Sequence, residues 1–103
     1  MKVFLSPLAE KKLEILLEFL EYRWSLNARN EFLDTFLIST QQISNHPKSC
    51  IESHEFEGLF KCVITKQTSY YYRILNDEIE IITIFDNRQN SQKVRAELKK
   101  FFS

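Results

Sequence analysis

The stretch that decides the fold of this chain is residues 59–92, LFKCVITKQTSYYYRILNDEIEIITIFDNRQNSQ. Three segments in it are rich in Ile, Val, Tyr, Phe and Thr, which favour strands: residues 59–65, 69–75 and 78–85. Residues 66–68 and 76–77 turn the chain between them, and a two-residue Asn-Asp link fits a tight hairpin. The stretch therefore predicts three consecutive strands that end in a short polar and basic corner, Asp86-Asn87-Arg88-Gln89-Asn90.

Two helices are expected before these strands. A short strand over residues 2–6 leads to Ser6, which can cap a helix that has Pro7 at its first position. Apolar residues then recur at helical spacing: Leu13, Leu16, Leu17, Leu20 and Trp24. Asn27 can cap a second helix that ends near Asn45, because the residue before Pro47 is pushed out of the helical region. The short connection makes the two helices an antiparallel hairpin.

The order of these elements predicts an α+β fold. A last helix over residues 91–102 completes the order βααβββα. A helical hairpin returns the chain to the level it left, so we expect the second strand to pair antiparallel with the first. The result is a four-stranded antiparallel sheet with the hairpin packed on one face, a two-layer sandwich. The core residues expected in it are Leu16, Leu20, Phe32, Phe36, Ile64 and Ile81 or Ile82.

The composition indicates one domain over residues 1–103. Hydrophobic residues at 44% and aromatic residues at 14% can fill one core and argue against disorder. The formal net charge is +0, whereas a dedicated nucleic-acid binder usually carries a basic excess, so any basic surface must be local. Apolar runs stay shorter than the roughly 18 residues of a membrane span, and the N-terminal apolar stretch is too short for a signal peptide. We therefore expect a cytoplasmic protein that does not enter a membrane.

Cysteine and histidine spacings do not suggest a cofactor. Cys50 and Cys62 lack a CxxC pattern or a Cys/His ladder, so they indicate neither a disulfide framework nor a zinc site. In the cytosol both thiols should stay reduced. His46 and His54 lie in or near the irregular loop of residues 48–58, without the spacing that metal ligands need. We expect no metal and no cofactor.

Four features together resemble a known family: the helical hairpin, Gly58-Leu59-Phe60-Lys61, Tyr72-Arg73-Ile74 and Ile84-Phe85-Asp86-Asn87-Arg88-Gln89-Asn90. In this order, over essentially the whole chain, they resemble toxins of the RelE/ParE superfamily of type II toxin–antitoxin systems, of the ParE-like, plasmid stabilisation type. The resemblance implies a cognate antitoxin and one of two targets. RelE-like members are ribosome-dependent endoribonucleases that cut mRNA, whereas ParE-like members act on DNA gyrase.

The site residues must choose between these activities, because the fold serves both. RNA cleavage needs a base for the 2′-hydroxyl, cations on the phosphorane and an acid for the leaving oxygen. The nuclease branch places an arginine before the aromatic run and often a histidine at the end of the last strand. Here these positions hold Ser69, or Thr68, and Asp86. This favours the gyrase target; a ribosome-dependent endoribonuclease, or a non-toxic interaction module that has decayed at the site, remain the alternatives.

The target-binding candidates are Lys61, Arg73 and Arg88. The two arginines also have a purely structural interpretation. Arg73 can stack on an aromatic ring or pair with a loop glutamate, and Arg88 can belong to a solvated corner. The run Tyr70-Tyr71-Tyr72 could stack bases, but alternation along a strand sends at least one of these rings into the core.

The first helix carries more apolar surface than one sheet face needs. Its additional residues indicate a groove for a partner helix, and the antitoxin-binding candidates are Ile15, Phe19, Tyr22 and Trp24. The resemblance implies that an antitoxin segment, partly disordered when alone, folds there on binding. A homodimer through the same helices, or a heterotetramer with the antitoxin, are the other assemblies that this surface allows.

Overall fold

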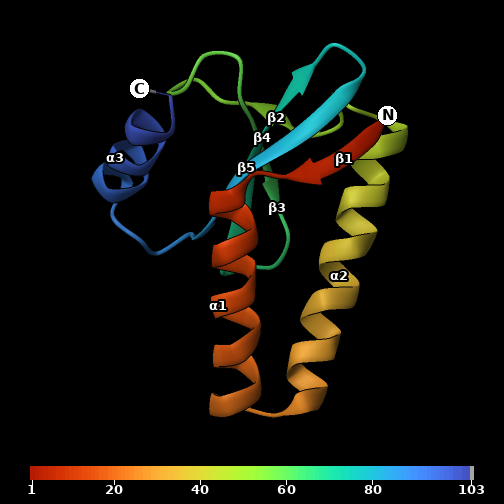
Figure 1. The fold of residues 1–103 in the computed structure, drawn as a ribbon, viewed down its shortest axis with the longest axis vertical. Helices are drawn as coiled ribbons and strands as arrows, with labels where there is room; N and C mark the ends of the chain where they lie inside the picture. Colours follow the sequence, from red (N-terminus) through yellow and green to blue (C-terminus); the bar gives the residue numbers. More distant parts are fainter. Residues whose placement is uncertain (103) are drawn as a thin grey trace.

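The structure, a computed structural model, describes residues 1–102 as a long helical hairpin beneath a twisted sheet, with a third helix beside it (Figure 1). The helices are α1 (Pro7–Arg23), α2 (Leu26–Asn45) and α3 (Ser91–Phe101). The strands are β1 (Lys2–Leu5), β2 (Ile51–Glu52), β3 (Phe60–Val63), β4 (Thr68–Leu75) and β5 (Glu78–Asp86). The predicted α+β class, with a helical hairpin packed on a sheet, is confirmed. Among residues 1–102, none of the helices is long and apolar enough to cross a membrane.

The sheet differs from the prediction in strand number and in the place of β1. It has five strands in the order β1-β5-β4-β3-β2, because the loop after α2 contributes the short edge strand β2. β2 to β5 pair antiparallel, but β1 pairs parallel with β5, from Lys2 opposite Glu78 to Leu5 opposite Ile81. The expected antiparallel pairing of the first strand with the second is therefore wrong.

The segment between α2 and β3 explains this difference. The end of α2 lies beside the start of β1, where the Met1 ammonium donates to the Ser44 carbonyl at 2.9 Å. The chain then enters the sheet as β2, which pairs antiparallel with β3 and so runs opposite to β1. The turn between β2 and β3 reverses the chain, and β3 consequently runs in the same direction as β1. The position next to β1 goes to β5, the most buried strand.

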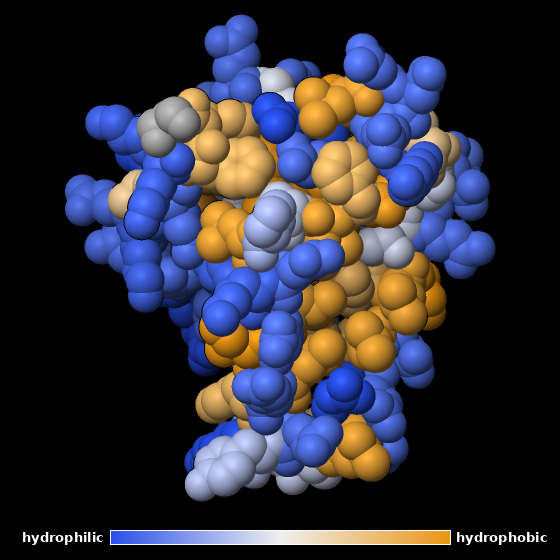
Figure 2. All heavy atoms as spheres, viewed as in Figure 1, coloured by the Kyte–Doolittle hydropathy of each residue, from blue (hydrophilic) through white to orange (hydrophobic). Residues whose placement is uncertain are grey.

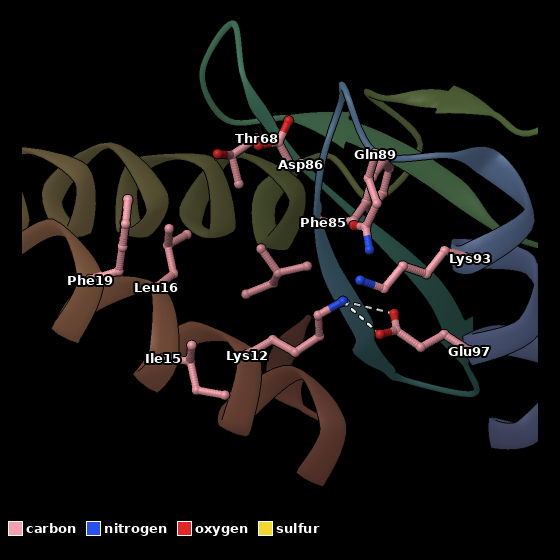
Figure 3. A pocket seen from close by; sticks show the side chains of 11 residues that line it. Lys12, Ile15, Leu16, Phe19, Thr68, Phe85, Asp86, Gln89, Lys93 and Glu97 are labelled. Carbon is pink, nitrogen blue, oxygen red and sulfur yellow. Dashed lines mark hydrogen bonds and ion pairs between the residues drawn. The ribbon is translucent and has the colours of Figure 1, made fainter.

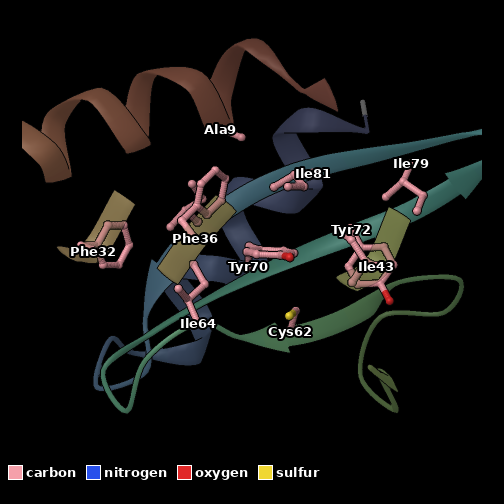
Figure 4. Packing of buried hydrophobic residues seen from close by; sticks show 11 residues of the cluster. Ala9, Phe32, Phe36, Ile43, Cys62, Ile64, Tyr70, Tyr72, Ile79 and Ile81 are labelled. Carbon is pink, nitrogen blue, oxygen red and sulfur yellow. The ribbon is translucent and has the colours of Figure 1, made fainter. Parts of the chain in front are cut away.

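Apolar side chains form one core on each face of the sheet. The cluster between the hairpin and the sheet contains the predicted Phe32, Phe36, Ile64 and Ile81 (Figure 4). The predicted Leu16 and Leu20 pack against this cluster. A second cluster joins the opposite face to α3: Leu59, Tyr71, Ile82, Phe85, Val94 and Leu98. Ile82 thus belongs to the second core, and α3 adds a layer that the two-layer prediction lacked.

Buried Ser6 fixes the start of α1 against the centre of the sheet. Its side chain caps α1 by accepting from the Ala9 amide at 3.0 Å, as predicted, with Pro7 at the first helical position. Its hydroxyl also donates to the Ile82 carbonyl at 2.6 Å. At this point Tyr71 faces Thr83 while Tyr72 faces Ile81, which leaves Ile82 as the extra residue of a β-bulge.

The second helix begins earlier than predicted. Ser25, and not Asn27, is its N-cap, and the Ser25 hydroxyl accepts from the Ala28 amide at 3.0 Å. Trp24 and Ser25 are enough to turn the chain between the helices, so Asn27 already lies in the first turn of α2.

Candidate functional site

The polar corner after β5 is held in place by Asn87. The Asn87 amide donates to the Gln67 carbonyl at 2.7 Å, and its side chain donates to the Lys66 carbonyl at 3.1 Å. The Asn87 side-chain oxygen accepts from the Ser69 hydroxyl at 2.7 Å. These bonds tie the corner to the turn between β3 and β4. Asn90 then caps α3 by accepting from the Gln92 amide at 2.8 Å, so the corner has a fixed backbone at both ends.

Arg88 projects from this corner with 71% of its side chain exposed. Its Nε and Nη2 donate to the two carboxylate oxygens of Asp86 at 3.1 and 2.8 Å, and its amide donates to Asp86 at 2.8 Å. Hydrogen bonds from Arg88 lower the pKa of Asp86 to about 2, and Asp86 raises the pKa of Arg88. A guanidinium has five N–H donors, so the pair orients Arg88 while leaving donors for another acceptor.

A groove of about 350 Å³ lies between α1, the corner and α3 (Figure 3). Its apolar wall comes from α1 and the sheet: Ile15, Leu16, Phe19, Ile84 and Phe85. Its polar side is formed by Lys12, Thr68, Asp86, Gln89, Lys93 and Glu97. The Lys12 ammonium pairs with Glu97 at 2.7 Å across the groove, and the Thr83 hydroxyl donates to Glu97 at 3.0 Å. α1 and α3 are thereby linked to β5.

The structure divides the antitoxin-binding candidates between the groove and the tip of the hairpin. Ile15 and Phe19 line the groove and are 55% and 53% exposed. Tyr22 and Trp24 lie near the end of α1 and are 93% and 68% exposed, with the Arg23 guanidinium 5.4 Å from the Trp24 ring. Apolar side chains also reach the surface over α2 and along its seam with α1 (Figure 2). All four candidates are therefore accessible to a partner.

The three basic candidates do not form a single cluster. The Lys61 ammonium lies 5.6 Å from the Phe85 ring, next to the corner. Arg73 lies further along β4, since Thr68 pairs with Asp86 whereas Arg73 pairs with Glu80. Five residues of strand separate these positions, which is about 17 Å. Arg73 therefore lies apart from the corner, and Lys61, opposite Tyr71 on the neighbouring strand, lies at a level between the two.

Arg73 is engaged within the protein. Its Nε donates to Glu80 at 2.7 Å, and its guanidinium lies 5.8 Å from the Phe101 ring and 5.1 Å from the Phe102 ring. Sequence reasoning gave stacking or ion pairing as the structural interpretation of Arg73, and both occur together. Its partner is a strand glutamate rather than a loop glutamate.

The tyrosine run faces inward. Tyr70, Tyr71 and Tyr72 are all buried, and burial raises the pKa of each phenol. Tyr70 shares a hydrogen bond of 3.1 Å with Ser39, and the Tyr72 hydroxyl donates to the Pro47 carbonyl at 2.7 Å. Tyr71 stacks on Phe85 with 4.9 Å between ring centroids. Because their faces are covered by the core, these rings serve packing rather than base stacking.

Sequence reasoning missed the polar side of the groove. Lys12, Lys93 and Glu97 come from two helices at opposite ends of the chain, and their spacing carries no signal that they meet. Within residues 1–102, the side chains of His, Cys, Asp and Glu form no group of three that could hold a metal ion.

A comparison with models of known protein families identifies the family in which these features occur together. A family model described as the ParE toxin of the type II toxin–antitoxin system parDE matches residues 3–91, which include the hairpin, the sheet and the corner. The chain belongs to the ParE toxin family. The resemblance to the RelE/ParE superfamily is thus confirmed, and most of α3 lies beyond the part that matches the ParE model.

Solved structures of ParE toxins share the fold at low sequence identity. A chain of the chromosomal ParDE TA system from P. aeruginosa is 12% identical with a TM-score of 0.71, over 84% of this chain and 95% of that chain. The YoeB/ParE toxin from Agrobacterium tumefaciens is 13% identical with a TM-score of 0.62, over 84% and 99%. No curated protein sequence matches the chain. At such identities the similarity to the solved structures shows the fold alone.

Proposed function

We propose that this ParE-family protein inhibits growth by binding DNA gyrase and that a cognate antitoxin neutralises it. The observation that carries the proposal is the exposed, oriented Arg88 on a rigid corner beside an apolar groove. A cation held by backbone and side-chain bonds needs little reorganisation when it binds a carboxylate or phosphate on a target. Lys61, whose ammonium lies 5.6 Å from the ring of Phe85, the residue before Asp86, is the second cation that we assign to the target contact.

The titratable groups around the corner favour binding over RNA cleavage. A general acid or base works best when its pKa lies near the working pH. The pKa of Asp86 is lowered to about 2 by Arg88, so Asp86 stays ionised near pH 7. This shift suits a surface that presents fixed charge rather than one that exchanges protons.

Induced expression in bacteria tests the toxicity and the target. The wild-type protein should arrest growth, and the purified protein should inhibit supercoiling of relaxed plasmid by gyrase. Arg88→Ala should abolish both effects while the thermal midpoint stays unchanged, because surface substitutions usually change stability by no more than about 0.5 kcal/mol. Lys61→Ala should weaken them less. Arg95→Ala is the matched control, since Arg95 also forms an exposed ion pair, with Glu55, but on α3.

Three outcomes would contradict the gyrase target. Codon-phased cuts in translated messages, detected by primer extension while supercoiling is normal, would assign the ribosome-dependent endoribonuclease instead. Arrest that survives Arg88→Ala in a folded protein would exclude the corner as the target contact. A folded wild-type protein that leaves growth unaffected would be the non-toxic interaction module.

We propose that the antitoxin covers the groove and the adjoining face of α1. The similar P. aeruginosa chain comes from a ParDE TA system, which supports a paired antitoxin here. An amphipathic segment could place apolar side chains against Ile15 and Phe19 and continue toward Tyr22 and Trp24. Because the corner borders the same groove, such a segment would also block Arg88 from its target.

Co-expression with the adjacent open reading frame tests this interface. The two products should copurify and growth should recover. Phe19→Ser should reduce copurification at least tenfold, whereas Ile38→Ser, at an even more exposed apolar position on α2, should not. Absence of both copurification and rescue would reject the partner. Sedimentation of the isolated toxin at micromolar concentration distinguishes a homodimer through the same helices from a monomer that awaits its antitoxin.

A further inference from the structure

Cys50 and Cys62, which the function proposed above does not use, lie opposite each other at the edge of the sheet. β2 and β3 pair with Ile51 opposite Lys61 and Glu52 opposite Phe60. One step further in this antiparallel register sets Cys50 opposite Cys62. The spacing of the two cysteines in the sequence did not indicate that they are neighbours. Their proximity depends on β2, a strand of two residues in a loop.

The hydrogen bonds of this ladder define what kind of pair the two cysteines form. The Ser53 amide donates to the Leu59 carbonyl at 2.7 Å, so Ser53 and Leu59 are a hydrogen-bonded pair. Such pairs alternate along an antiparallel ladder with non-hydrogen-bonded pairs, whose Cα atoms lie about 4.5 Å apart. In this alternation the positions of Cys50 and Cys62 form a non-hydrogen-bonded pair. Disulfides accept Cα separations of about 4.4–6.8 Å, so the backbone geometry allows a bridge.

The side chains agree with the register. Cys50 packs against the core cluster that contains Cys62 (Figure 4 shows Cys62 within it). Burial raises the pKa of Cys62 to about 12, and interaction with the Cys50 thiol adds to the rise, which places the two thiols next to each other. Both are free thiols in the structure.

The two thiols differ in access. Cys62 is 6% exposed. Cys50 is half-buried and lines an open surface hollow together with Lys48 and Glu52. Reactivity of a thiol follows its exposure and its thiolate fraction, so Cys50 meets a dissolved oxidant first and Cys62 reacts second.

We propose that Cys50 and Cys62 are an oxidisable cross-strand pair that a peroxide converts into a disulfide between the β2 segment and β3. Cys50 gives up its proton, its thiolate attacks one peroxide oxygen, and the O–O bond breaks. The leaving hydroxide takes up that proton as water, and Cys50 is left as sulfenic acid. The Cys62 thiol then gives up its proton as its sulfur bonds to the Cys50 sulfur, and the S–O bond breaks to release a second water. Two thiols lose two electrons in all, and hydrogen peroxide is reduced to two molecules of water.

The disulfide would close the segment between β2 and β3 into a covalent loop. A cross-link of this kind restricts the unfolded chain, so the oxidised protein should be more stable than the reduced one. It would also fasten β2, the strand at the end of the sheet that carries the exposed Ile51, to its neighbour. The inference is independent of which target the protein binds.

Titration of the purified full-length protein with hydrogen peroxide tests the pair. The intact mass should fall by two hydrogen atoms, and a non-reducing digest should contain a peptide that joins Cys50 to Cys62. The thermal midpoint should rise by about 5 °C or more and return to its starting value with dithiothreitol. Cys50→Ala should remove the rise while Cys62 stays a free thiol, and Cys62→Ala should leave Cys50 to gain oxygen atoms or to pair between molecules.

Other products would overturn the proposal. Wild-type protein that gains oxygen at Cys50 while Cys62 remains free would show that the thiols cannot meet. Disulfide-linked dimers without the internal peptide would lead to the same conclusion. The same peroxide treatment can be applied to the urea-unfolded chain as a control. If it links the two cysteines there but leaves both thiols free in the folded protein, the native structure prevents the bridge.

Discussion

At the scale of single residues, Arg73 shows how a basic side chain in a sheet can serve the fold. It is opposite Glu80, a buried carboxylate whose residue is 8% exposed, and donates to it at 2.7 Å. Its guanidinium also lies against Phe101 and Phe102. Leaving the buried Glu80 carboxylate without a partner would be costly, so the ion pair fixes the position of Arg73. Because the Arg73 guanidinium also contacts Phe101 and Phe102, it holds the end of α3 on the sheet.

Arg73→Ala should therefore lower the free energy of unfolding by about 1–3 kcal/mol, because the buried Glu80 loses its hydrogen-bond partner. Urea unfolding measures this. The double variant Arg73→Leu and Glu80→Leu should recover part of the loss by removing both charges. If Arg73→Ala leaves the urea midpoint unchanged while reducing toxicity, Arg73 is instead a target contact, as the sequence also allowed.

At the scale of elements, α3 covers the face of the sheet that lies opposite the helical hairpin. Val94 and Leu98 pack against Tyr71, Ile82 and Phe85. Polar contacts fix its direction, since Glu97 accepts from both Lys12 of α1 and Thr83 of β5. The polar side of the groove thus depends on the position of α3, which supplies Lys93 and Glu97 to it.

Leu98→Ala should cost about 2–5 kcal/mol, the usual loss for a buried leucine, and should loosen α3 before the rest of the molecule. Hydrogen exchange should show protection falling in residues 91–101 and at Tyr71, with β1 and the hairpin less affected. Lys99→Ala, at the exposed neighbouring position, should change the free energy of unfolding by no more than about 0.5 kcal/mol and leave hydrogen exchange as in the wild type. Equal loss of protection in every element would mean that α3 does not open separately.

At the scale of the whole molecule, the hairpin-side core is rich in weakly acidic groups that burial keeps protonated. The pKa of Cys62 rises from 9.0 to about 12, and burial also raises the pKa values of Tyr70 and Tyr72. In the unfolded chain Cys62 begins to ionise near its ordinary value, whereas in the folded chain it keeps its proton. The unfolded state then binds fewer protons, so stability falls as pH rises through this window.

The urea midpoint of the reduced protein should accordingly hold steady up to about pH 8 and decline between pH 9 and 12. Cys62→Ala should start from a lower midpoint, because it leaves a cavity, but should decline less steeply with pH. A midpoint that stays flat to pH 11 in the wild type would show that these groups do not ionise differently in the two states.

The sequence predicted what nearby residues determine. The Ser6-Pro7 cap, the three consecutive strands and the hairpin of helices depend on local spacing, and each was confirmed, although β3 covers only Phe60–Val63. The parallel place of β1 was missed because it depends on β2, the short strand whose turn into β3 reverses the chain. The polar side of the groove and the Cys50–Cys62 pair were missed because their residues meet only through the pairing of distant segments.

The parallel pairing of β1 with β5 also has a consequence for the order in which the sheet forms during synthesis. Lys2 leaves the ribosome well before its partner Glu78, which follows only after the hairpin and three further strands. A growing chain that stops before Glu78 leaves β1 without a neighbour, and Ser6 without the Ile82 carbonyl to which it donates. The corner with Arg88 comes later still. During synthesis β1 must therefore wait, and the sheet closes in one late, long-range step that joins β1 to β5.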